Sequence, residues 1–172
     1  MRRYSPRSPR YRSFAAAAAS AVTLLAGADA AIAAPAPRLA LDISTTSYHT
    51  RQWARDSLNQ DNPGLGLEYQ LSPEWGLAAG EYRNSYRRTS LYALAAWTPL
   101  RLALTSSGWR IAAGLDAGVI SGYTSAEAPA RPLMASALLE VRSPQGWGIN
   151  LVDVPNMGQS AGFIGLQLVM PL

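Results

Sequence analysis

A single histidine and the absence of cysteine narrow the chemistry that this chain of 172 residues can perform. Without cysteine there can be no disulfide framework, no Cys-ligated zinc site and no thiol nucleophile, and one histidine excludes a multi-histidine metal site. Any serine that an imidazole activates must use His49, and the two side chains must lie close together. We predict Ser85 as the nucleophile and His49 as the base, with Asn84 positioning the substrate or an oxyanion.

Other interpretations of these residues stay open at the level of the sequence. Four further serines compete with Ser85 for proximity to the histidine: Ser47, Ser57, Ser90 and Ser121. A polar rim with a surface histidine and a turn-forming Asn-Ser pair would contain the same residues without catalysis. Arginine forms bidentate contacts with phosphate. We predict lipid or phosphate contact for Arg51, Arg83, Arg87 and Arg88, with solvation of the loops as the alternative.

The first 34 residues have the pattern of a secretory signal peptide. Five arginines precede an Ala-rich apolar stretch at residues 14–28, and two triplets of small residues come next. We expect cleavage between Ala30 and Ala36, which leaves one domain over residues 35–172. The net charge of the whole chain is +4, but after residue 34 there are 10 basic and 10 acidic residues. The basicity therefore belongs to the export signal and gives no support to nucleic-acid binding.

The rest of the chain contains eight segments in which apolar residues alternate with small or polar ones, which is the period of a half-exposed strand. They lie at about 39–44, 64–71, 75–80, 92–96, 109–119, 133–142, 147–152 and 164–172. The bulky residues of a segment share one face, as Leu65 and Leu67 do, and as we expect for Tyr92 and Leu94. No window holds a helical period for long.

These segments predict an all-β fold, an eight-stranded antiparallel outer-membrane β-barrel with an up-and-down meander. The 20 charged residues after residue 34 are too few to cover a soluble surface, whereas a membrane barrel has an apolar outer face and a narrow interior of small or polar residues. Aromatic residues fall near expected strand ends, where interfacial girdles belong: Tyr48, Tyr69, Trp75, Trp97, Trp109, Tyr123 and Trp147. Four charged residues lie at positions where the alternation of the strand would direct them into the lumen, and we expect them to pair there: Glu68, Asp116, Glu140 and Arg142. A soluble periplasmic barrel of lipocalin type is the alternative.

Loop lengths predict the orientation of the barrel. Short turns fall at residues 72–74 and 143–146, and about ten residues join the fourth and fifth strands. The longer connections lie at about 50–62, 83–90, 121–131 and 153–160. In bacterial barrels the long loops face outward and the termini face the periplasm. This orientation brings His49, Asn84 and Ser85 to the outer rim.

Several short motifs occur in a characteristic order along residues 45–172. They are His49, Gly64-Leu65-Gly66-Leu67, Asn84-Ser85, the run from Gly114 to Val119, Pro129, Pro132-Leu133, Val154-Pro155, Phe163 and Gln167. In combination they resemble the PagP family, the outer-membrane lipid A palmitoyltransferases. The family has an amphipathic helix before its first strand, and about five residues are too few for one here.

The resemblance implies an eight-stranded barrel that transfers a palmitoyl chain from a phospholipid to lipid A. Its partners would be outer-membrane phospholipid and lipopolysaccharide, with no metal and no diffusible cofactor. His49 and Ser85 match the family's functional residues, and Asn84 stands where the family has Asp. The resemblance also implies an apolar acyl pocket in the lumen, for which small inward residues would leave space: Gly76, Ala78, Gly80, Ala112, Gly114 and Gly118. Close packing in a narrow barrel would explain them equally well.

Two classes of function stay open, because Asn84 keeps the shape of the family's Asp but lacks its charge. The first is a PagP-like acyltransferase. The second is a non-catalytic barrel that binds lipid or a small apolar ligand, or a structural surface protein. A lipid A deacylase also pairs Ser and His on an eight-stranded barrel, but its acid-containing motif has no match here. In each case we expect a monomer in a Gram-negative outer membrane, with no nucleic-acid partner.

Overall fold

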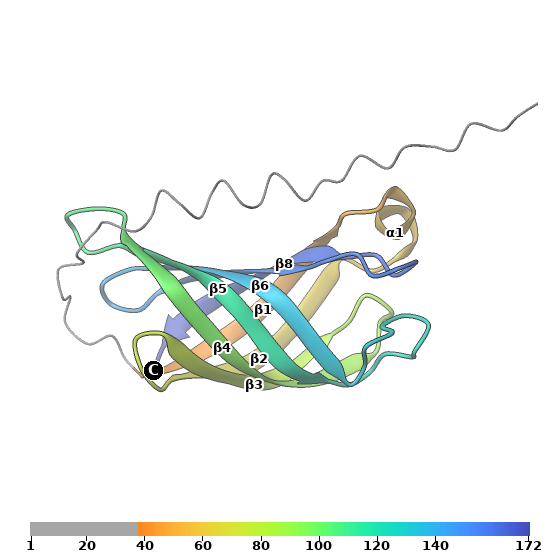
Figure 1. Ribbon diagram of the computed structural model, residues 1–172, viewed down its shortest axis with the longest axis horizontal. Coiled ribbons are helices and arrows are strands. Elements are labelled where there is room, and N and C mark those ends of the chain that lie inside the picture. Colours follow the sequence, from red (N-terminus) through yellow and green to blue (C-terminus); the bar gives the residue numbers. More distant parts are fainter. Residues whose placement is uncertain (1–37) are drawn as a thin grey trace, which may run out of the picture.

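The computed structural model describes residues 38–172, and over this range the chain forms eight strands and one short helix (Figure 1). The strands are β1 (Leu39–His49), β2 (Asp61–Gln70), β3 (Trp75–Arg83), β4 (Thr89–Ala103), β5 (Arg110–Ile120), β6 (Leu133–Arg142), β7 (Gly148–Val154) and β8 (Phe163–Pro171), and the helix is α1 (Gln52–Ser57). The predicted signal peptide, residues 1–34, lies outside the described residues. No helix in the described range is long and apolar enough to cross a lipid bilayer.

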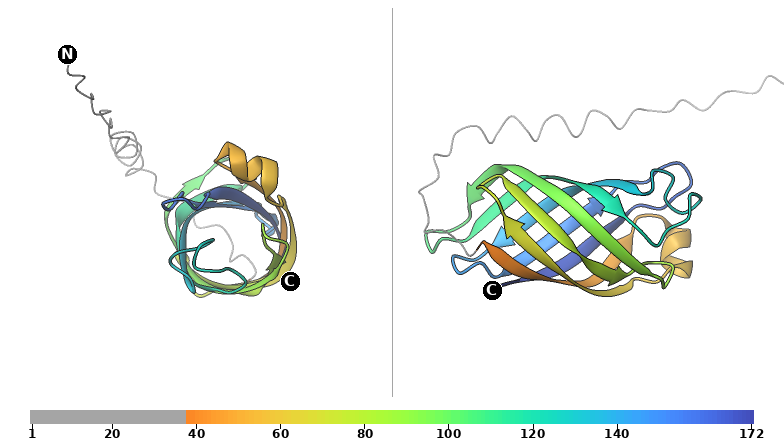
Figure 2. Two further views of the ribbon diagram at one scale, coloured as in Figure 1. Left: turned by 90° about the vertical axis from the view of Figure 1, so that its right-hand side faces the viewer. Right: turned by 90° about the horizontal axis from the view of Figure 1, so that it is seen from below.

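The strands close into a barrel in the order in which they occur along the chain. Each strand pairs antiparallel with the next, and β8 pairs with β1, from Ala40 with Pro171 to His49 with Phe163. The end-on view shows the resulting ring (Figure 2). The predicted fold class, an eight-stranded antiparallel barrel with meander order, is confirmed.

Two irregularities change the strand lengths that the alternation indicates. A register shift between Trp97 and Leu100 lets β4 continue past Pro99, which has no N–H to donate and is tolerated at such a shift. As a result β4 reaches Ala103, and six residues, not ten, join it to β5. The connection between β1 and β2 contains α1, which the strand-period analysis did not anticipate.

The outer face of the barrel is apolar and exposed. Large side chains project from it on most strands, among them Leu65 (56% exposed), Leu115 (55%) and Leu133 (64%). The residues that alternate with them point into the lumen, where buried residues are mainly polar. This arrangement is the reverse of a soluble barrel, in which large apolar residues fill the interior.

Two expectations about side-chain direction are wrong. In β4, Tyr92 and Leu94 line the interior and Leu91 projects outward, because this strand is apolar on both faces and its alternation does not reveal which face is buried. Tyr123 does not belong to an interfacial girdle, since its hydroxyl meets that of Tyr82 at 2.9 Å beside the lumen. The other aromatics of the predicted girdles are exposed, and Trp75 stacks on Trp97 across neighbouring strands.

The two ends of the barrel differ as the loop lengths indicate. Figure 1 shows short turns at the end where the chain terminates, and α1 with the longer loops at the other. We call these the turn end and the loop end. The predicted site residues belong to the loop end, because His49 closes β1 and Asn84 follows β3.

Candidate functional site at the loop end and in the lumen

A β-bulge in β1 directs His49 into the barrel. The register of β1 shifts between Ser44 and Thr46 against both neighbouring strands. Such a bulge inserts one extra residue and reverses the faces of the residues after it. Ser47 and His49 are consequently buried, while Tyr48 is 57% exposed. Without the bulge, the histidine would point away from the lumen.

Asn84 is held by its own loop, by the start of β4 and by the loop between β5 and β6. Its amide nitrogen donates to Ser90 Oγ (3.0 Å) and to the carbonyl of Gly122 (2.9 Å). Its side-chain oxygen accepts from the backbone N–H groups of Tyr86 (2.9 Å) and Arg88 (3.1 Å). A carboxylate could accept these last two bonds but could not donate the first two. The amide therefore fits this position better than the Asp that the PagP-like pattern would have.

Ser85 and His49 share the loop end but have different surroundings. Ser85 is buried and lines the lumen cavity, and its carbonyl accepts from the N–H of Asn59 (2.9 Å). His49 is 1% exposed, is not among the residues that line that cavity, and packs its ring 5.9 Å from that of Phe163. Within residues 38–172 no hydrogen bond joins the two side chains, and the buried Nδ1 of His49 has no partner. Their catalytic pairing stays a prediction.

The four arginines of the predicted lipid contact divide into two pairs. Arg51 donates to the carbonyls of Gly158 (2.6 Å) and Gln159 (3.0 Å), and so ties one loop to another. Arg88 forms an ion pair with Glu127 and donates to Gly122 O (2.8 Å). Arg83 and Arg87 are exposed, and among the described contacts their side chains form no hydrogen bond. These two have guanidinium groups available for an outside anion.

Polar contacts join the loops to one another at the loop end, beside Tyr82 and Tyr123. Glu127 also accepts from the N–H of Thr124 (2.7 Å), and its backbone carbonyl accepts from Ser160 Oγ (2.6 Å). Burial by itself raises the pKa of Glu127, but the bond from Thr124 and the Arg88 guanidinium outweigh it and lower that pKa below its ordinary value. Burial raises the pKa of the nearby Tyr123 phenol. The carboxylate is therefore ionised and the phenol neutral at physiological pH.

A cavity of about 110 Å³ occupies the lumen below these loops. One water molecule needs roughly 10–15 Å³ on the same measure, so there is room for more than a few waters. The wall formed by β1 and β2 is polar, with Ser44, Ser47 and Asn62. Strands β5 to β7 contribute the apolar Ile120, Leu138 and Val152, and also the polar Asp116, Glu140 and Asn150. The cavity lining combines polar and apolar side chains, which differs from the wholly apolar acyl pocket that the resemblance implies.

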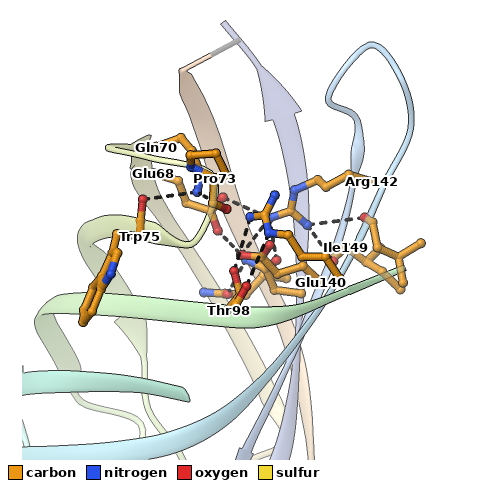
Figure 3. A network of polar contacts seen from close by, with 12 residues as sticks. Glu68, Gln70, Pro73, Trp75, Thr98, Glu140, Arg142 and Ile149 are labelled. Atoms are coloured by element: carbon orange, nitrogen blue, oxygen red, sulfur yellow. Dashed lines mark hydrogen bonds and ion pairs between the residues drawn. The ribbon is translucent and has the colours of Figure 1, made fainter. Parts of the chain in front are cut away.

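The turn end of the lumen contains a charged cluster that we call the lumen plug: Glu68, Glu140, Arg142, Asn150 and Gln167 (Figure 3). Arg142 donates to Glu68 (3.0 Å), to Asn150 (2.7 Å) and to the carbonyl of Ile149 (2.8 Å). Glu140 lies 3.9 Å from the same guanidinium. Such buried charges persist because each has a partner of opposite sign or a hydrogen bond.

The predicted pairing of lumen charges is confirmed for Glu68, Glu140 and Arg142. Asp116 is also buried, but it is bonded by the hydroxyl of Ser136 and has no cation. Sequence reasoning missed Asp42 and Tyr92 as lumen residues. Asp42 alternates with the apolar Leu41 and Ile43, and this alternation could have identified it as a lumen residue. Nothing comparable was available for Tyr92.

The small residues that were expected to form a smooth pocket floor do not form one. Gly76 and Ala78 line the cavity, but the space above Gly80 is taken by the backbone of Leu65 and Gly66 and by the hydroxyl of Tyr92. Gly114 and Gly118 lie against the backbone of β4 and leave no free volume, as close packing in a narrow barrel requires. The expectation of inward space at these positions is therefore met only in part.

No protein-family model matches the chain, and no curated protein shows significant sequence similarity to it. In the described part of the chain, no three His, Asp or Glu side chains are grouped so that they could hold a metal ion.

Proposed function

We propose that the chain is an outer-membrane β-barrel that binds a small amphipathic molecule in its lumen. The observation that carries membrane insertion is the inverted distribution of polarity. Leucines exposed by about half of their surface lie on the outside, and charged residues are buried inside. In water such an outer face would cost free energy at about 25 cal/mol for each Å² of apolar surface, and a hydrocarbon phase removes that cost.

Fractionation tests this first part of the proposal. In a Gram-negative host, the protein should migrate with outer membranes on a sucrose gradient and resist extraction by carbonate. It should also migrate differently on gels with and without heating, as closed barrels do. Recovery of the folded protein in the soluble periplasmic fraction would contradict membrane insertion and favour the lipocalin-type alternative.

The cavity supports ligand binding over a purely structural role. A barrel that serves only as a scaffold can fill its lumen with side chains, as small eight-stranded barrels do. Here the plug lies towards one end, and it borders a cavity that is lined by both polar and apolar side chains. Pockets of this kind bury an apolar body and orient it with a few polar contacts.

A second candidate function is PagP-like acyl transfer at the loop end. The observations that favour it are the buried, unpartnered Nδ1 of His49 and the place of Ser85 on the cavity wall. In this proposal the acyl group moves from a phospholipid ester to a hydroxyl of lipid A, and lysophospholipid is released. The Ser85 hydroxyl would attack the phospholipid ester, and His49 would take its proton and give it to the departing lysophospholipid oxygen. The lipid A hydroxyl would then take the acyl group from Ser85 and return a proton to it, while Arg83 and Arg87 would bind lipid phosphates.

Mass spectrometry of lipid A tests the second candidate. Expression of the chain should add an acyl chain to lipid A, and Ser85→Ala should abolish the addition because the hydroxyl is lost. Ser107→Ala, an exposed serine in the turn between β4 and β5, should leave it intact. Identical lipid A in cells with and without the protein would rule out acyl transfer and leave ligand binding as the function.

A further inference from the structure

Two buried polar groups face the lumen cavity without a partner, and both lie where the cavity meets the plug. Asp42 is 1% exposed and its Oδ1 has no hydrogen-bond partner among the described residues. Tyr92 is 7% exposed and its hydroxyl has none either. Both residues line the cavity. A buried polar atom with no partner costs roughly 1–3 kcal/mol, so a pair of them at one cavity needs an explanation.

The strand register places these two groups in one row. Asp42 pairs with Gly66, Gly66 pairs with Gly80, and Gly80 pairs with Tyr92. The two glycines leave the inner wall bare, and the tyrosine ring lies across it. A Cβ on Gly66 would come within 2.1 Å of the Tyr92 hydroxyl, so this hydroxyl lies directly over the residue that pairs with Asp42. The carboxylate and the phenol therefore converge on one small region.

The charges around the cavity select the sign of its occupant. Four acidic residues line it, Asp42, Glu68, Asp116 and Glu140, and none of its described lining residues is an arginine or a histidine. Arg142 compensates Glu68 and Glu140 from below, and Ser136 bonds Asp116. Among the described residues Asp42 has no ion pair and its Oδ1 accepts no hydrogen bond, while the Glu68 carboxyl is a close neighbour; two adjacent buried carboxyls are unfavourable unless a proton or a cation lies between them.

We propose that the lumen binds a small organic ammonium ion, with its charged nitrogen between Asp42 and Tyr92 and its apolar body against the side chains of Ile120, Leu138 and Val152. An ammonium group has three donors and no acceptor, so it can satisfy the Asp42 carboxylate and the Tyr92 oxygen together. Its charge supplies the compensation that Asp42 lacks. This inference rests on the proposed lumen binding and specifies the class of ligand.

Calorimetric titration of the protein in dodecyl maltoside with three probes tests the inference. The probes are hexylammonium, hexanol and hexanoate, which share a chain and differ in charge. Hexylammonium should bind about 10–100-fold more tightly than hexanol. A hydrogen bond between charged groups contributes more binding free energy than a neutral one, and affinity rises exponentially with that difference. Hexanoate should not bind, since four acidic residues line the cavity.

Variants distinguish binding at the proposed site from partition of the amine into the detergent micelle. Asp42→Asn should reduce hexylammonium affinity to the level of hexanol, and Tyr92→Phe should reduce it several-fold while the barrel keeps its heat-dependent gel mobility. Asp61→Asn, a matched change of an exposed carboxylate, should have no effect. Unchanged affinity in both Asp42→Asn and Tyr92→Phe would overturn the inference.

The remaining outcomes distinguish this inference from the function on which it rests. Equal binding of hexylammonium and hexanol to the wild-type protein would overturn the ammonium site but retain an amphipathic ligand cavity. Failure of all three probes to bind would overturn both, and would mean that waters alone occupy the space.

Discussion

Arg142 is the residue on which the charge balance of the lumen depends. Its guanidinium is 9% exposed and is shared between two carboxylates, one asparagine and two backbone carbonyls. Removing one partner of a buried ion pair leaves the other charge without compensation, which costs more than the pair itself contributes. The plug is therefore far more sensitive to truncation than an exposed ion pair of similar chemistry.

Arg142→Met should lower the free energy of unfolding by about 3–5 kcal/mol, because Glu68 and Glu140 lose their cation. Arg88→Met offers a matched control: the side chain of Arg88 is 45% exposed, and its pair with Glu127 should contribute about 0–1 kcal/mol. Urea unfolding in detergent, followed by tryptophan fluorescence, measures both. Adding Glu68→Gln to Arg142→Met should recover part of the loss. Equal losses from the two arginine variants would contradict the assigned role of the plug.

At the scale of elements, neighbouring strands approach so closely in places that only glycine fits. Gly80 and Gly76 occupy the same face of β3, yet their surroundings differ. A Cβ on Gly80 would lie 2.4 Å from the carbonyl oxygen of Leu65, a backbone atom that cannot move without breaking the pairing of β2 and β3. The nearest atom to a Cβ on Gly76 is 3.6 Å away, which is ordinary contact.

Gly80→Ala should therefore destabilise the barrel by about 1–3 kcal/mol, the usual cost of overpacking. Gly76→Ala should change stability by no more than about 0.5 kcal/mol. The temperature at which the folded band disappears in gel-mobility assays ranks the two variants. A larger loss from Gly76→Ala than from Gly80→Ala would show that the register between β2 and β3 differs from the one described here.

The strands could be predicted from the sequence because a strand whose two faces have different surroundings alternates in polarity with a period of two residues. The eight segments, the meander and the outward parity of Leu65 and Leu67 all follow from that period. The period fails where both faces are apolar, as at Tyr92, and where a bulge against β8 inserts a residue, as at Thr45. Neither the direction of His49 nor the row that joins Asp42 to Tyr92 could be derived, because both depend on register between strands.

The candidate site could be predicted only in part, because topology follows from the sequence pattern whereas side-chain contacts do not. The shared loop end of His49 and Ser85 follows from topology, since β1 and β3 run in the same direction around an antiparallel barrel. Whether two side chains meet depends on their rotamers and on the loops between them. The bonds of Asn84 to Ser90 and Gly122 could not have been expected from the adjacent Asn-Ser pair alone.

At the scale of the whole molecule, the environment of the outer face decides how the barrel responds to charge. Leu67, in the middle of β2, and Leu104, in the turn after β4, are almost equally exposed, at 48% and 50%. In water, replacing either leucine by arginine would expose a charge to solvent at little cost. In a bilayer, the first position faces hydrocarbon and the second lies at the turn end near the interface.

Leu67→Arg should therefore lower the free energy of unfolding from lipid bilayers by about 2–4 kcal/mol, and Leu104→Arg by about 0–1 kcal/mol. Reversible unfolding by guanidinium in phosphatidylcholine vesicles measures this difference. The same pair measured in detergent micelles, which adapt more readily to a charge, serves as the reference. If both variants were as stable as the wild-type protein in vesicles, the apolar outer face would not contact lipid, and membrane insertion would have to be abandoned.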